Sequence, residues 1–153
     1  MARAKALADD RQSLYERDFC LWLEQQAALL HDGRFDELDL ANLIEEIEAM
    51  ARKDKKVIKS NLVVLLTHLL KHQFEPGQRS SGWRGGVVEH RQRLRHDFEE
   101  SPSLRSQAAA VFARAYADAR ERASAETGLP LRTFPRSSPY TLEQTLDSKF
   151  LPD

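Results

Sequence analysis

Apolar residues are densest between Asn61 and His72, where they fill positions 62 to 66 and then 69 and 70. On a helix of 3.6 residues per turn these positions cover nearly the whole circumference, so a helix here has no polar face. Such a helix is buried on all sides. The run is too short, and its neighbours are too polar, to cross a membrane. The pattern therefore predicts a central helix around which the rest of the chain packs.

Two further helices are predicted on the N-terminal side of this central helix. One runs from Ser13, whose spacing to Glu16 is that of a capping box, to about His31. The other begins at Leu40 and carries apolar residues at i, i+3, i+4, i+7, i+10 and i+11, the most regular amphipathic pattern in the chain. The charged run that follows contains neither glycine nor proline. We predict a bend or short break near Asp54, which makes this helix and the central one two separate elements.

Two more helices and an ordered tail are predicted on the C-terminal side. Ser80 or Ser81 caps the fourth helix, and the dipeptide 101–102, Ser-Pro, begins the fifth, which ends before Gly128. A second capping-box spacing over 141–144 predicts a short helix. The tail also carries three aromatic residues that favour packing against the helices, namely Phe134, Tyr140 and Phe150.

The predicted fold class is therefore all-α. We expect a single-domain helical bundle of five main helices plus a short C-terminal helix over residues 13–153, preceded by a flexible N-terminal lead over residues 1–12. Short connections between the helices favour an up-and-down arrangement.

Several stretches form a recognisable combination that covers nearly the whole chain. They are Leu14–Phe19, Leu21–Glu24, Gly33–Phe35, Leu38–Glu48, Val64–Lys71, Ser101–Arg105, Glu126–Leu129 and Pro139–Gln144. In these stretches the chain resembles the bacterial family known as domain of unknown function 29. It departs from the family at Ala51 and His72, where the resemblance leads us to expect a glycine and an aromatic residue. The resemblance implies an all-α fold and no particular activity.

Composition narrows the compartment and the class of partner. The chain has 153 residues, of which 31% are charged, and a net charge of -1, so neither a nucleic acid nor a membrane is suggested as a partner. The single cysteine, Cys20, excludes an internal disulfide. Because the first residues lack the apolar segment of a secretory signal, we expect a cytoplasmic protein.

Two histidines are candidate metal ligands. His68 and His72 lie at i and i+4, which places both on one helix face, and Glu45 and Glu48 on the preceding helix are candidate carboxylate ligands. Together they would hold a transition metal. The alternative is a core histidine satisfied by one hydrogen bond and a second histidine that suits the dipole at a helix end. No other cofactor is predicted.

Charge is segregated along the chain. Residues 34–50 carry a net charge of -5, whereas residues 79–96 carry +4. The basic residues near one side of the fourth helix are Arg84, Arg91 and Arg95. They can contact phosphates, or they can pair with an acidic group on the second helix. That acidic group consists of Glu45, Glu46 and Glu48.

These observations rank three hypotheses of function. The preferred one is a small cytoplasmic protein-interaction or adaptor domain without catalysis, which binds a protein partner or self-associates, because no catalytic set is assembled and the two charged helices are complementary. The first alternative is a nucleic-acid-associated protein that uses the fourth-helix arginines. The second is a metal-dependent enzyme that uses His68 and His72.

Overall fold

The computed structural model describes residues 14–153, and all regular secondary structure in this part of the chain is helical. The predicted lead of residues 1–12 lies outside the described residues, as does Ser13. Contacts between Cα atoms divide the chain into an N-terminal unit that ends at Arg52 and a C-terminal unit, Lys53–Asp153. The expectation of a single domain stays a prediction.

The N-terminal unit contains a helical turn over residues 14–17, helix α2 (Phe19–His31), the short 3-10 helix η1 (Phe35–Glu37) and the first part of helix α3 (Leu40–Phe74). The Asp18 carboxylate accepts a hydrogen bond of 3.0 Å from the backbone N–H of Leu21, and so caps α2. The prediction of one continuous helix from residue 13 to residue 31 is therefore wrong. A side chain that bonds to the backbone locally competes with the helix and interrupts it at Asp18.

A small core holds the N-terminal unit together. Trp22 is fully buried, and its indole N–H donates to the Asp39 carboxylate over 3.0 Å. The Gln26 side chain, also buried, accepts from the backbone N–H of Asp39 over 2.8 Å. Tyr15 packs edge-on against Trp22 with ring centroids 4.8 Å apart. Asp39 therefore joins the start of α3 to α2 through two buried hydrogen bonds.

Helix α3 is continuous over 35 residues, so the predicted bend or break near Asp54 is wrong. The run over residues 51–57 is exposed and contains Ala51, arginine and lysines. These residues have high helix propensity, and no glycine or proline removes a backbone hydrogen bond. Within residues 14–153, the five main helices predicted are consequently four long ones, α2, α3, α4 and α5, followed by the short α6.

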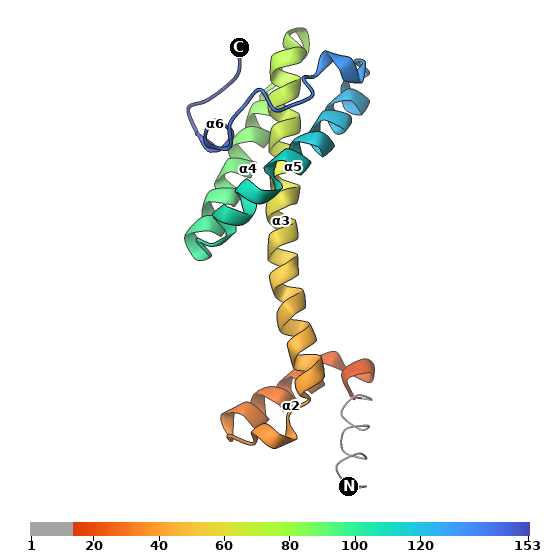
Figure 1. The fold of residues 1–153 in the computed structure, drawn as a ribbon, viewed down its shortest axis with the longest axis vertical. Coiled ribbons are helices and arrows are strands. Elements are labelled where there is room, and N and C mark those ends of the chain that lie inside the picture. Colours follow the sequence, from red (N-terminus) through yellow and green to blue (C-terminus); the bar gives the residue numbers. More distant parts are fainter. Residues whose placement is uncertain (1–13) are drawn as a thin grey trace. The chain divides into compact units, whose positions relative to one another are not determined.

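The C-terminal unit is built around the part of α3 that was predicted to be central. Five apolar residues of this segment are completely buried, as is Ile58 just before it; the five are Leu62, Leu65, Leu66, Leu69 and Leu70. Helix α4 (Ser81–Glu100) runs back beside α3, and helix α5 (Leu104–Thr127) returns across both (Figure 1). The buried face of α5 is rich in alanine, which lets its backbone approach α3 closely. The predicted central helix and the all-α bundle are confirmed.

The C-terminal tail packs against this unit, as predicted. It contains the 3-10 helix η3 (Leu131–Thr133) and helix α6 (Leu142–Leu146), which begins with the predicted capping box of Thr141 and Gln144. Phe134 and Tyr140 are buried, and the Tyr140 hydroxyl donates to the Gln73 side chain over 2.7 Å. None of the helices in residues 14–153 is long and apolar enough to cross a membrane.

Candidate functional site

The four predicted metal ligands fall in different units. Glu45 and Glu48 belong to the N-terminal unit, where Arg52 lies 2.8 Å and 3.8 Å from their carboxylate oxygens. His68 and His72 belong to the C-terminal unit. Among the described residues, no three His, Cys, Asp or Glu side chains form a group that can hold a metal ion. The histidines therefore have to be interpreted from their own surroundings.

His68 lies against the backbone of α4. A Cβ atom at Gly86 would lie 2.5 Å from His68 Nε2, so α4 approaches this closely only because residue 86 is a glycine. The His90 ring is 6.4 Å away, and His90 Nδ1 is hydrogen-bonded to the Asn61 amide oxygen over 2.8 Å. Burial lowers the pKa of both histidines, and nearby Lys71 lowers that of His68 further. These histidines are neutral groups of the helix interface.

The arginines predicted to form one interaction surface have different environments. Arg91 is only 4% exposed, and its Nε donates to the backbone carbonyl of Thr145 in α6 over 2.9 Å. Desolvation lowers the pKa of Arg91, while Asp147 acts in the opposite direction. The prediction that Arg91 belongs to an exposed surface is wrong, because α6 covers it and uses it as an anchor.

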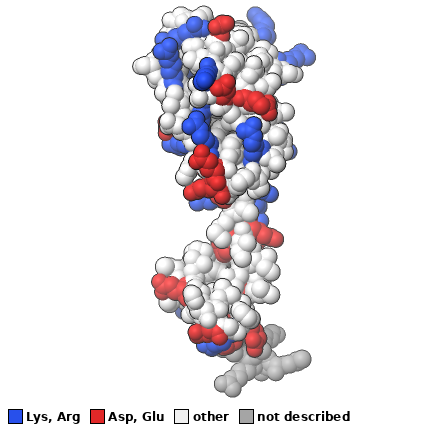
Figure 2. All heavy atoms as spheres, turned by 90° about the vertical axis from the view of Figure 1, so that its left-hand side faces the viewer, with Lys and Arg blue, Asp and Glu red and all other residues white. Residues whose placement is uncertain are grey.

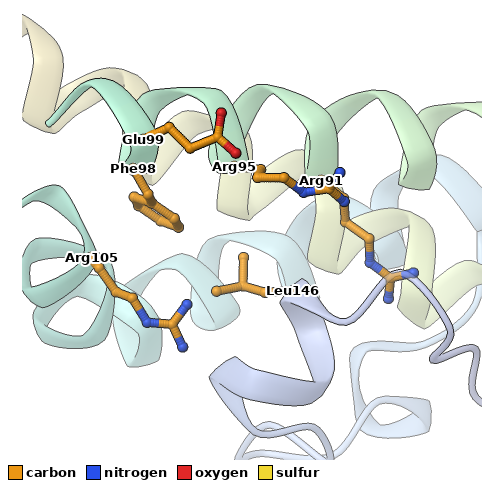
Figure 3. Close-up of a pocket in the computed structure, with 6 residues that line it drawn as sticks. All are labelled: Arg91, Arg95, Phe98, Glu99, Arg105 and Leu146. Atoms are coloured by element: carbon orange, nitrogen blue, oxygen red, sulfur yellow. The ribbon is translucent and has the colours of Figure 1, made fainter. Parts of the chain in front are cut away.

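Arg95 lines a hollow of about 290 Å³ between α4, α5 and α6. In Figure 3 the Arg105 side chain points toward Leu146, and the Phe98 ring faces the same space. The full lining is Arg91, Arg95, Phe98, Glu99, Arg105 and Leu146. Arg84 lines a different hollow, at the start of α4. The three arginines therefore do not form one site.

The predicted acidic residues pair within the N-terminal unit. The Tyr15 hydroxyl donates a hydrogen bond to the Glu46 carboxylate, and this bond raises the pKa of Tyr15. Glu45 and Glu48 face Arg52, as described above. The acidic segment of α3 thus has local partners.

The N-terminal unit also exposes an unusual amount of apolar surface. Nine of the thirteen large apolar side chains that are most exposed among the described residues lie between Phe19 and Met50. Four of them follow one side of α3, and we call them the α3 stripe: Leu40 (61% exposed), Ile44 (48%), Ile47 (60%) and Met50 (60%). Uncharged residues cover most of this unit in Figure 2, whereas basic residues gather on the C-terminal unit. Monomeric proteins rarely present extended apolar patches without a function.

Comparison with known proteins places the chain in a family. Residues 14–151 match the family model described as Domain of unknown function DUF29. The chain belongs to the DUF29 family. No curated protein and no solved structure matches it.

Sequence reasoning missed two features of this DUF29 chain. The first is the apolar exposure of the N-terminal unit, since an amphipathic pattern reports a helix face but not whether another element covers it. The second is the pairing of Gly86 with His68. The adjacent glycines at 85 and 86 were the available signal, but they do not say which side chain requires the space.

Proposed function

We propose that this DUF29 chain is a protein-interaction module that pairs with a second copy of itself through the N-terminal unit. The observation that carries the proposal is the α3 stripe, whose four side chains are each about half exposed or more. Complete burial of such a side chain contributes about 1.5–3 kcal/mol, and each of the four is about half exposed. A partner surface that covers the stripe would therefore contribute roughly 1 kcal/mol of binding free energy for each side chain.

The spacing of the stripe favours a helix as the partner surface. Leu40, Ile44 and Ile47 of the stripe lie at i, i+4 and i+7, and Ala51 beside Met50 continues the pattern at i+11, which is the alternating spacing of a helix that packs along another helix. A two-fold axis sets the same stripe of two copies against each other, because such an interface uses one patch twice.

Charge along α3 favours a second copy in the antiparallel direction. Residues 45–48 carry three glutamates, for a charge of -3, and residues 52–56 carry four basic residues and one aspartate, for a charge of +3. In an antiparallel pair of stripes, centred between Ile44 and Ile47, the basic segments of the two copies lie at opposite ends of the seam. A parallel pair would place like charges together at both segments.

We place this module in the cytoplasm. Cys20 is an exposed free thiol, and a reducing compartment protects such a thiol from oxidation.

Sedimentation equilibrium of the full chain and of Ile47→Glu tests the self-association. We expect a dimer for the natural chain and a monomer for the variant, because the substitution places a carboxylate in the apolar seam of both copies. Ile47 is exposed in the single chain, so helicity measured by circular dichroism should not change. The matched control is Val88→Glu on α4, which makes the same charge change at a residue that is 54% exposed and lies outside the N-terminal unit.

Two results would contradict the proposal. One is a natural chain that remains monomeric throughout the micromolar range. The other is an Ile47→Glu chain that dimerises as tightly as Val88→Glu.

A further inference from the structure

A second hollow lies at the start of α4, in the C-terminal unit and apart from the proposed dimer surface. Its volume is about 370 Å³. It is bounded by the end of α3, by the segment that follows the 3-10 helix η2 (Pro76–Gln78) and by the C-terminal tail. Its lining is His72, Arg79, Ser80, Ser81, Arg84 and Leu151. The lining thus contains two guanidinium groups and no carboxylate.

The N-terminus of α4 contributes free donors to this hollow. The Ser80 hydroxyl accepts from the backbone N–H of Trp83 over 3.2 Å, and the Ser80 carbonyl accepts from that of Arg84 over 3.4 Å. The backbone N–H groups of Ser81 and Gly82 have no acceptor among the described residues. Because α4 is 20 residues long, these two donors lie at the positive end of a full helix dipole.

His72 is the second, independent indication of a ligand. Its residue is only 8% exposed, and neither ring nitrogen has a hydrogen-bond partner in the part of the chain that the structure describes. The ring nitrogens of His72 are not among the fully buried unpartnered atoms of the described residues, so they are reached from the hollow and are available to a ligand there. Burial first, and then the nearby Arg79 and Arg84, lower the pKa of His72. An anion bound in the hollow would counteract the effect of these two arginines on the pKa of His72.

The two arginines are arranged to receive an anion. Arg79 Nε donates to the backbone carbonyl of His72 over 2.9 Å, which fixes the side chain while leaving its terminal nitrogens available. The Arg84 side chain is exposed and makes no hydrogen bond or ion pair within residues 14–153. Planar guanidinium groups bind phosphate oxygens in pairs, and a fixed guanidinium loses little entropy on binding.

We propose that this hollow binds the phosphate group of a small phosphate monoester. The phosphate would accept from Arg79 and Arg84, from the free N–H groups at the start of α4, and from His72. A tetrahedral phosphate offers three terminal oxygens, which suits donors that come from several directions better than the two oxygens of a carboxylate do. The hollow is larger than a phosphate ion, so it has room for the organic part of the ligand beside Leu151.

Calorimetric titration of the full chain with inorganic phosphate and with glycerol phosphate, at constant ionic strength, tests the proposal. We expect both to bind, with glycerol phosphate at least as tight as inorganic phosphate. Arg84→Gln should weaken binding by about tenfold or more, since a hydrogen bond to a charged group contributes about 1.5–3 kcal/mol. The matched control is Arg95→Gln, which removes the same charge from the same helix at the other hollow and should bind as the natural chain does.

The proposal is overturned if the natural chain binds neither phosphate nor glycerol phosphate. It is equally overturned if Arg84→Gln and Arg95→Gln lose the same affinity, because general positive charge would then account for binding. His72→Gln supplies a second measurement and should also weaken binding. If this buried substitution unfolds the chain, the exposed Arg84 still decides the outcome. Neither variant touches the α3 stripe, so the dimer test remains separate.

Discussion

Substitution of the two adjacent glycines of α4 provides a sharp test of the packing between α3 and α4. A Cβ atom at Gly86 would lie 2.5 Å from Nε2, 2.8 Å from Cδ2 and 3.0 Å from Cε1 of His68, whereas a Cβ atom at Gly85 meets nothing within 4 Å. Both residues lie inside the same helix, and neither has a positive φ. Gly85→Ala and Gly86→Ala therefore add the same methyl group, without a steric conflict at residue 85 and with one at residue 86.

The expected free energies follow from two opposing effects. Replacement of glycine by alanine inside a helix stabilises by about 1 kcal/mol, and this gain is available at both positions. At Gly86 the His68 ring has to move within a packed interface, which costs about 1–3 kcal/mol. We expect Gly85→Ala to raise the free energy of unfolding by about 1 kcal/mol. Gly86→Ala should lower it by about 0–2 kcal/mol, the difference between the two effects.

Urea denaturation followed by circular dichroism measures both variants, and a double-mutant cycle identifies the cause. In a His68→Ala background the steric conflict is absent, so Gly86→Ala should become as stabilising as Gly85→Ala. The reasoning is refuted if Gly86→Ala stabilises the natural chain as much as Gly85→Ala does. It is also refuted if the effect of Gly86→Ala is the same with and without the His68 ring.

Three further outcomes are expected. Leu65→Ala, at a completely buried position, should lower the free energy of unfolding by about 2–5 kcal/mol in a denaturant melt. Arg91→Gln should remove the hydrogen bond to the Thr145 carbonyl and so speed limited proteolysis of residues 130–153; cleavage at the natural rate would contradict the anchoring role. Burial lowers the pKa of His90 below its ordinary 6.5, so its contribution to stability is complete above pH 6.5 and is lost as the pH falls through the folded-state value. Melts between pH 8 and pH 5 should thus show a smaller loss of stability on acidification for His90→Gln than for His96→Gln, which changes an exposed histidine and serves as the control.

The candidate sites show how far helical spacing can predict function. The period of α4 places Arg84, Arg91 and Arg95 near one side, and this is correct as a statement about one helix. It cannot report that α6, which lies more than fifty residues later in the sequence, supplies a carbonyl that takes Arg91 out of solvent. Nor can it report that the connection between α3 and α4 brings Arg79 beside His72.

The sequence by itself determined the features that depend on neighbouring residues. The apolar positions 62–66, 69 and 70 favour burial whatever surrounds them, and five of these seven are completely buried. The capping box at Thr141 depends on residues three positions apart. Local signals were decisive there because the interacting groups are close along the chain. The predictions at Asp18 and Asp54 were wrong although the deciding features are also local: Asp18 caps the helix three residues on, and the charged run around Asp54 has uninterrupted helix propensity.

Only the tertiary structure decided which amphipathic faces are covered. The face of α4 that carries Val87 and Leu94 is buried by α3 and α5, whereas the equally regular α3 stripe is left exposed in the N-terminal unit. The two patterns look alike in sequence because the hydrophobic effect is non-directional. An apolar face is more stable out of water, but its pattern does not specify which element covers it. That choice depends on contacts between residues far apart in the chain, and these contacts exist only once the helices have packed.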